Sequence, residues 1–188
     1  MKSLRIYIAG KVSPHSVFGK HDWRDDFCKE LSKKSGLIIK NLDPTKSDED
    51  FYLNEKDYML IFGRDCFMIQ LADIVIVNLT DDISVGGSQE MLIAKYFKKP
   101  LIGIAPLGGK FRKESKEIRG EEYNDYTDPF VFVPCDVIVN NIDEAAEVMK
   151  KLFSEEQGKI KDIKDLGIID DALSYYKKEH HAKDKFVH

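Results

Sequence analysis

The sequence has little of what marks several common protein classes. Among its 188 residues are three cysteines, with no CxxC pair and no Cys/His spacing of a metal site. We therefore expect neither a disulfide scaffold nor structural zinc, but reduced thiols and a cytoplasmic location. No apolar run approaches the roughly 20 residues of a membrane span. The N-terminus also lacks the apolar stretch of a signal peptide, so we expect no membrane partner.

Phosphate-binding motifs are also missing. The first apolar run ends in Ala9-Gly10-Lys11, which does not continue into the G-x-G-x-x-G of a dinucleotide site. The stretch Gly108-Gly109-Lys110-Phe111 lacks both the first glycine and the Ser or Thr of a P-loop. Twenty-nine basic and 33 acidic residues give a net charge of -4, which argues against a partner that is a nucleic-acid polymer. A single nucleotide as ligand remains compatible with this charge.

Short apolar runs alternate with amphipathic stretches along most of the chain. Ile74–Asn78 is apolar on both faces and β-branched, which is typical of a central parallel strand. The expected strands are Arg5–Ala9, Leu37–Lys40, Ile74–Asn78, Leu101–Ile104 and Val137–Val139. The expected helices are a stripe through Trp23, Phe27 and Leu31, then Tyr58–Leu71, Gln89–Lys98 and Asp143–Phe153. This alternation predicts an α/β fold, a flavodoxin-like or Rossmann-like three-layer sandwich with a five-stranded parallel sheet.

Two segments fall outside this pattern. Ala105–Pro129 is rich in charges and glycine, and we expect a long loop there, a candidate lid. Residues 154–188 follow the last helix of the sheet, and Asp170–His181 within them has helical character. The sequence thus predicts an α/β domain over residues 1–153 and a partly helical C-terminal extension over residues 154–188.

The segment after the central strand, Asn78–Glu90, is the most informative, because such sheets bind ligands beyond the carboxyl ends of their strands. Its glycines allow close approach of the backbone to a ligand, and its serines offer hydroxyl groups. These residues are Ser84, Gly86, Gly87 and Ser88. Glu90 is expected in the first turn of the following helix, at the mouth of the sheet. The alternative interpretation is a capping-box acid that only favours the helix dipole.

A second acid precedes the central strand. Gly63-Arg64-Asp65 falls within the expected helix Tyr58–Leu71, where a solvated Arg–Asp pair is the alternative interpretation. Asp73, directly before the strand, is interpreted as a cap or turn residue. Two carboxylates at one pocket mouth would move each other's pKa apart, which permits one to act as acid and the other as nucleophile.

Several motifs occur in the order of a known family. They are IYIAG at Ile6–Gly10, RDCFMIQLADIVIVNL at Arg64–Leu79, SVGGSQEMLIA at Ser84–Ala94, KKPLIGI at Lys98–Ile104 and DVIV at Asp136–Val139. Together they resemble the nucleoside 2-deoxyribosyltransferase family, which also contains nucleoside 5′-monophosphate N-glycosidases. The resemblance covers roughly residues 4–153.

The resemblance implies roles for three residues. Glu90 matches the family's nucleophilic glutamate, which lies in a glycine-containing turn that opens a helix. Asp65 matches an aspartate that holds the sugar or protonates the base. Tyr7 matches a tyrosine of the first strand that orients the nucleophile, although a strand tyrosine is also commonly packed core.

The glycine-rich turn departs from the family pattern. Transferases that act on free nucleosides carry an aspartate six residues before the glutamate, where this chain has Ser84, as monophosphate-preferring members do. Asp82, two residues earlier, is the alternative acid, and Gly86-Gly87-Ser88 stands where Gly-x-Gly is common. Gly10-Lys11 resembles a substrate-binding loop of some members. Ser84, Ser88 and nearby backbone N–H groups are the expected receivers of a 5′-phosphate.

The expected function is therefore cleavage of the N-glycosidic bond of a nucleoside or its 5′-monophosphate. A covalent glycosyl–Glu90 intermediate would pass the 2-deoxyribosyl group to another nucleobase or to water. This chemistry requires no metal and no organic cofactor, and family resemblance implies a role in nucleotide salvage and a homo-oligomer. The alternatives are a non-catalytic nucleotide-binding or sensing module, and a response domain, which would need an aspartate where Gly10-Lys11 stands.

Overall fold

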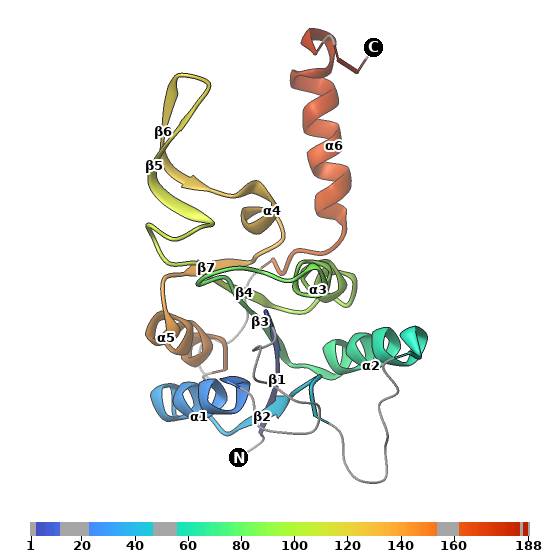
Figure 1. Cartoon of the computed structure of the whole chain (residues 1–188), viewed down its shortest axis with the longest axis vertical. Coiled ribbons are helices and arrows are strands. Elements are labelled where there is room, and N and C mark those ends of the chain that lie inside the picture. The colour runs from blue at the N-terminus through green and yellow to red at the C-terminus, as the bar shows by residue number, and fades with distance from the viewer. Residues whose placement is uncertain (1–2, 12–22, 47–55, 154–161, 185, 188) are drawn as a thin grey trace.

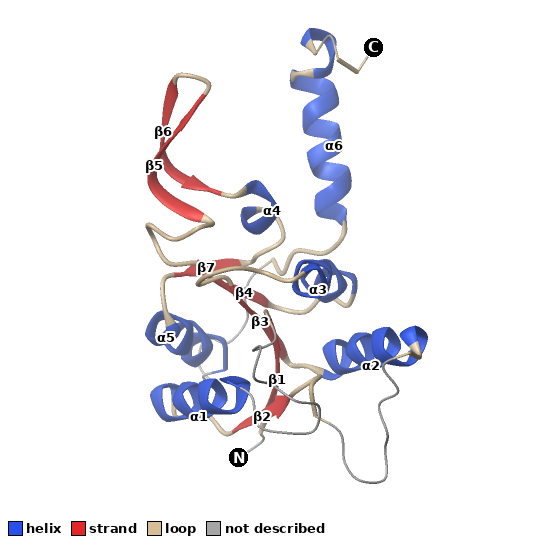
Figure 2. Ribbon diagram, in the orientation of Figure 1, coloured by secondary structure: helices blue, strands red, loops and turns tan. Residues whose placement is uncertain are grey.

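The computed structural model describes residues 3–11, 23–46, 56–153, 162–184 and 186–187. Because ligands bind beyond the ends of the strands, the segments 10–18 and 43–50 are also of interest. The parts of these two segments after Lys11 and Lys46 lie outside the described residues. Helices and strands occur in the alternating order that the sequence predicts, with an additional hairpin and a helical arm (Figures 1 and 2).

Five parallel strands form the central sheet. They are β1 (Leu4–Ala9), β2 (Ile39–Leu42), β3 (Ile74–Asn78), β4 (Leu101–Ile104) and β7 (Val137–Val139). Their order is β2-β1-β3-β4-β7, which is the flavodoxin-like order. The chain adds β2 on one side of β1, and then β3, β4 and β7 in succession on the other side. The predicted fold class is confirmed, with the second strand beginning two residues later than expected.

Four helices cover the two faces of the sheet. α1 (Trp23–Ser35) and α5 (Ile142–Phe153) pack on one face, and α2 (Tyr58–Leu71) and α3 (Val85–Tyr96) on the other (Figure 1). Since alternate side chains of a strand point to opposite faces, Ile6 and Ile8 join the core under α1 and α5. Tyr7 and Ala9 instead join the core under α2 and α3, so the Tyr7 hydroxyl is directed toward α3.

The start of α3 differs from the expectation. The helix begins at Val85 rather than Gln89, because the Ser84 Oγ accepts a hydrogen bond from the Gly87 N–H at 3.0 Å and caps it. Gly87 allows close packing here, since a Cβ atom would lie 3.0 Å from Ile83 Cγ1 and 3.4 Å from the Gly10 nitrogen. Glu90 consequently lies in the second turn of α3 and not in the first.

The expectation of a loop over Ala105–Pro129 is wrong. This segment contains an antiparallel hairpin of β5 (Arg112–Ile118) and β6 (Glu121–Thr127), followed by the short helix α4 (Pro129–Phe132). Arg119 and Gly120 connect the strands, both at positive φ (56° and 84°), which is typical of a tight two-residue turn. Most side chains of the hairpin are exposed and polar, so the apolar alternation that reveals a half-buried strand is missing.

The C-terminal residues form an arm. α6 (Gly167–Glu179) is followed by a 3₁₀ turn, η1 (His181–Lys183), and the two extend away from the sheet (Figure 2). The preceding Lys164 is tied to the body: its N–H donates to Asp136 Oδ1 at 2.8 Å and its Nζ donates to the Cys135 carbonyl at 2.7 Å. A domain boundary at residue 153 stays a prediction. Within the described residues, every helix is too short or too polar to cross a bilayer.

Candidate active site

A pocket of about 230 Å³ lies beyond the carboxyl ends of β1 and β3, where the fold predicts a ligand site. Helix and loop residues far apart in the sequence line it. They are Gly10, Arg24, Pro44, Thr45, Ile61, Arg64, Asp65, Ser84, Gly86 and Glu90. Five of these, Gly10, Asp65, Ser84, Gly86 and Glu90, are candidates from the sequence.

Tyr7 and Glu90 form the centre of this site. The Tyr7 side chain is buried in the sheet, and its hydroxyl donates to Glu90 Oε1 at 2.8 Å. Burial, followed by the charges of Glu90 and Asp65, raises the pKa of Tyr7 well above its ordinary value. The phenol therefore remains a hydrogen-bond donor at physiological pH, and it fixes one carboxylate oxygen of Glu90, which is a lining residue of the pocket.

The electrostatic surroundings of Glu90 favour its protonated form. Burial raises the pKa of the Glu90 carboxyl to about 7, and the nearby charge of Asp65 acts in the same direction. The hydrogen bond from Tyr7 and the charge of Arg24 oppose this shift. The capping-box interpretation does not fit, because Gly87, not Glu90, occupies the position that pairs with the Ser84 cap.

Asp65 reaches the same pocket from α2. Burial raises the pKa of this carboxyl to about 6, with Arg64 and Arg24 opposing the shift. The adjacent Arg64 donates to the carbonyls of Pro44 (2.8 Å) and Lys46, so it connects α2 to the loop after β2. The alternative of a solvated Arg–Asp pair on the helix surface therefore does not describe these residues.

Arg24 is a pocket residue that the sequence analysis did not select. Its side chain is 2 % exposed, and the guanidinium donates to the carbonyls of Ile8 and Gly10, each at 3.1 Å. It thereby holds the end of β1 in place and brings a positive charge beside the two carboxyls. The available signal was its spacing: Arg24 lies four residues before Cys28 and seven before Leu31, on the buried side of α1.

Tyr7 meets the site through its hydrogen bond to Glu90 and does not itself line the pocket. Four further sequence candidates do not line it either: Lys11, Asp82, Gly87 and Ser88. Lys11 is exposed, and Asp82 forms an ion pair with Lys110 at 2.7 Å, a contact that lowers the pKa of Asp82. The Ser88 hydroxyl donates to the Val85 carbonyl at 2.7 Å, within its own helix. Gly87 is buried where α3 meets Gly10, so its role is in packing.

Asp73 also lies apart from the pocket, as a turn residue before β3. Its carboxylate accepts from the backbone N–H of Arg5 at 2.8 Å and from that residue's guanidinium at 3.1 Å. These bonds join the turn to β1. Among the described residues, no group of three or more His, Cys, Asp and Glu side chains is placed to hold a metal ion.

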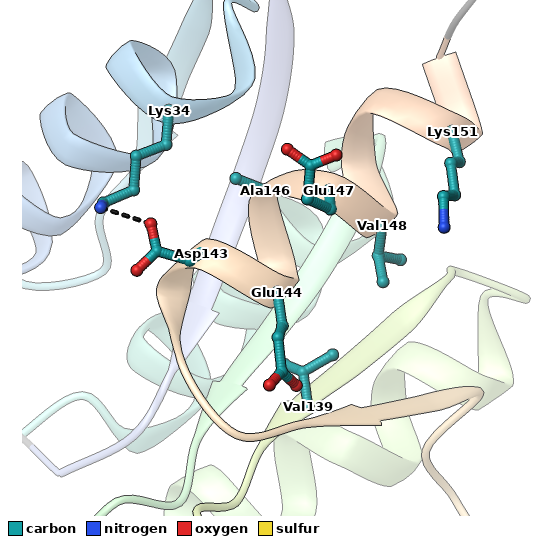
Figure 3. Close-up of a pocket in the computed structure, with 8 residues that line it drawn as sticks. All are labelled: Lys34, Val139, Asp143, Glu144, Ala146, Glu147, Val148 and Lys151. Atoms are coloured by element: carbon teal, nitrogen blue, oxygen red, sulfur yellow. Dashed lines mark hydrogen bonds and ion pairs between the residues drawn. The ribbon is translucent and has the colours of Figure 1, made fainter.

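A larger hollow of about 490 Å³ lies beside α5 and holds none of the candidate residues (Figure 3). Its polar lining is occupied by contacts within the protein. Lys34 Nζ contacts Asp143 Oδ1 at 2.5 Å, and Glu144 accepts from the backbone N–H of Asn140 at 2.8 Å. These contacts tie α1 and β7 to α5, which indicates a structural role for this surface.

The chain was compared with known proteins. No protein-family model matches it, and no curated protein matches it in sequence. The solved structures similar to it include the following three. A conserved protein from Enterococcus faecalis has a TM-score of 0.51 at 16 % identity, over 79 % of this chain and 98 % of that one. A 2-deoxyribosyltransferase from Bacillus psychrosaccharolyticus has a TM-score of 0.46 at 14 % identity, over 76 % of this chain and 90 % of that one.

The third is a CMP N-glycosidase from Clostridium botulinum, with a TM-score of 0.39 at 16 % identity, over 77 % of this chain and 97 % of that one. At these identities the likeness concerns the fold. The chain thus shares the flavodoxin-like α/β fold of the Enterococcus faecalis protein, over nearly the whole length of that protein.

Proposed function

We propose that this protein cleaves the N-glycosidic bond of a nucleoside or nucleoside 5′-monophosphate through a covalent glycosyl–Glu90 intermediate. The observation that carries the proposal is a carboxylate that is held by a buried phenol, at 2.8 Å, inside a pocket with a second carboxyl. The motifs shared with the nucleoside 2-deoxyribosyltransferase family support the same role for Glu90.

The two carboxyls divide the chemistry between them. With both pKa values raised, to about 7 and about 6, the pair holds about one proton near neutral pH. In the free site this proton lies mainly on Glu90, whose pKa is the higher of the two, so the reactive form is the less populated one with Glu90 ionised and Asp65 protonated. The hydrogen bond from Tyr7 stabilises the Glu90 carboxylate of that form. Ionised Glu90 then attacks the anomeric carbon as the bond to the base breaks, and protonated Asp65 gives its proton to the departing base nitrogen.

A second nucleobase or water resolves the ester. Attack at the anomeric carbon breaks its bond to Glu90 and releases the free carboxylate. The incoming base or water loses a proton, which returns to Asp65. Arg24, Arg64 and Ser84 all line the pocket, and the two guanidinium groups favour an anionic substrate. We therefore rank the 5′-monophosphate above the free nucleoside.

The test incubates the full chain with a panel of deoxynucleosides and their 5′-monophosphates, with and without a second free base. Chromatography then shows base exchange for a transferase or free sugar for a hydrolase. Mass spectrometry of acid-quenched protein should find one added sugar or sugar phosphate on the peptide that contains Glu90. Binding of these compounds without any turnover would contradict the proposal and favour the nucleotide-sensing alternative.

A further inference from the structure

Arg24 is a charged side chain that is buried where β1 ends and α1 begins. Only 2 % of it is exposed, and a buried guanidinium needs partners for its N–H groups and for its charge. The Nε donates to the Ile8 carbonyl and the Nη2 to the Gly10 carbonyl, each at 3.1 Å. The guanidinium carbon also lies 4.8 Å from the centre of the Trp23 ring. These contacts fix the position of the charge.

The Gly10 carbonyl that Arg24 binds belongs to a tightly packed junction. A Cβ atom at Gly10 would lie 3.5 Å from the Cβ of Asn78, at the end of β3. A Cβ atom at Gly87, in the first turn of α3, would lie 3.4 Å from the Gly10 nitrogen. Arg24 therefore holds the end of β1 against the start of the helix that carries Glu90.

The charge of Arg24 acts on the reactive groups of the site. Arg24, Asp65 and Glu90 line the same pocket of about 230 Å³. Burial raises the pKa of both carboxyls and of Tyr7, and the charge of Arg24 opposes this change in all three groups. A guanidinium keeps its charge throughout the physiological range, so this influence persists whichever carboxyl holds the proton.

The other charged and titratable groups of α2 act mainly on Asp65. After burial, the largest influence on the pKa of Asp65 is the charge of Arg64, which lowers it. Burial, and then the charge of Asp65, raises the pKa of the Cys66 thiol, which is therefore neutral near pH 7. For Glu90, burial is again the largest influence, and Arg24 is the cation among the described residues that opposes it. The two carboxyls thus share Arg24 as a cation.

We propose that Arg24 is a positioning residue that serves as the counter-ion of the ionised Glu90 carboxylate. A carboxylate in a buried site is strongly disfavoured without a positive charge nearby. The inference rests on the proposed function, in which Glu90 must be ionised before it attacks the anomeric carbon. Arg24 would make this less populated form of the site accessible, and its bonds to β1 keep the charge in place while the reaction proceeds.

The first test uses the free protein and needs no substrate. Carbon-13 NMR of the side-chain carboxyl groups follows the ionisation of Glu90 as pH is varied, and Glu90→Gln identifies its signal. Arg24→Met should move the Glu90 midpoint to higher pH, because the charge that opposes burial is gone. Arg24→Lys keeps a cation without the planar fork, so its midpoint should lie between the two. The matched control is Lys29→Met, which removes an exposed cation of α1 and should leave the midpoint unchanged.

The second test is kinetic. Because Arg24 acts on both carboxyls, both limbs of the kcat/KM profile should move to higher pH in Arg24→Met, and kcat should fall roughly 10²-fold. Arg24→Lys should recover part of both effects. A residue that served only in packing would lower activity equally at every pH and leave the limbs in place. Circular dichroism checks the fold, and Arg24→Gln, which can still donate to one carbonyl, replaces Arg24→Met if that variant does not fold.

The two tests separate this inference from the proposed function. An unchanged Glu90 midpoint in folded Arg24→Met or Arg24→Gln would overturn the role of Arg24, whether or not the chain cleaves nucleosides. A midpoint that moves as expected, in a chain that turns over no nucleoside or nucleotide, would leave Arg24 as the counter-ion and contradict the proposed function alone.

Discussion

Two tyrosine–glutamate hydrogen bonds of almost equal length lie in different regions of the molecule. Tyr7 donates to Glu90 at 2.8 Å in the pocket, and Tyr123 donates to Glu121 at 2.9 Å on the hairpin. The hairpin pair is exposed, whereas the pocket pair is surrounded by the sheet and α3. Burial, and not the hydrogen bond, is what raises the pKa of Glu90 to about 7. Two hydrogen bonds of nearly equal length thus lie in different surroundings, and burial accounts for the raised pKa of Glu90.

A third pair shows what burial does when the partner carries the opposite charge. Lys95, also on α3, is buried and contacts Asp136 at 2.5 Å, and it donates to the Lys99 carbonyl at 2.9 Å. Asp136 in turn accepts from the N–H groups of Leu101 and Lys164. The Lys95–Asp136 pair therefore connects α3, β4 and the residues before the arm. Glu90 instead accepts a hydrogen bond from the neutral Tyr7 phenol and lines the pocket.

The largest expected effect is on activity. Glu90→Gln should lower turnover by about 10³-fold or more, because the amide removes the nucleophile and leaves the shape of the pocket unchanged. Glu121→Gln is the matched control, since it makes the same change in the exposed glutamate that Tyr123 contacts on the hairpin. This variant should keep wild-type turnover. The rate of base release, followed by chromatography, measures both. Full activity of Glu90→Gln would remove Glu90 from the mechanism.

The buried ion pair should control stability instead. Lys95→Met leaves Asp136 buried without its cation, and it should lower the free energy of unfolding by about 3–5 kcal/mol in urea titrations. Lys113→Met, on the exposed hairpin, should change it by less than about 0.5 kcal/mol. An equally small loss for Lys95→Met would show that the pair is not a structural anchor.

The pH dependence of stability should separate Glu90 from Glu121. The pKa of Glu90 is raised from 4.5 to about 7 in the folded chain, so between these values the folded state binds more protons than the unfolded state. The free energy of unfolding therefore falls as pH rises through this window, by at most about 3 kcal/mol. Thermal melts of Glu90→Gln should lose this contribution, whereas Glu121→Gln should keep the wild-type slope. An unchanged slope in Glu90→Gln would contradict the raised pKa.

The smallest expected effect comes from the tyrosines. Tyr7→Phe removes a hydrogen bond that lowers the pKa of Glu90, so the acidic limb of the kcat/KM profile should move to higher pH and turnover should fall about tenfold. Tyr123→Phe, its counterpart on the hairpin, should alter neither. A rate loss in Tyr7→Phe without any shift of the pH profile would mean that Tyr7 acts only in packing.

Local patterns predicted much of this structure. The alternation of apolar runs and amphipathic stretches predicted five strands and four helices. This is possible because a buried strand or helix face requires apolar residues in a run or at a regular spacing along the chain. The hairpin was missed because residues such as Glu117 and Glu122 are exposed and polar, so its strands leave no such period. The start of α3 was misplaced because Gly86 and Gly87 disfavour a helix locally, and the Ser84 cap overrides that preference.

By itself the sequence determined the layered α/β architecture, and it indicated Glu90, Asp65 and Tyr7 as candidates through motifs that lie along the chain. Only the tertiary structure decided that these three meet, that Arg24 joins them, and that Asp82, Lys11 and Ser88 lie outside the pocket. The physical reason is that secondary structure follows from nearby residues, whereas burial and the pKa of a carboxyl depend on segments that folding brings together from distant parts of the chain.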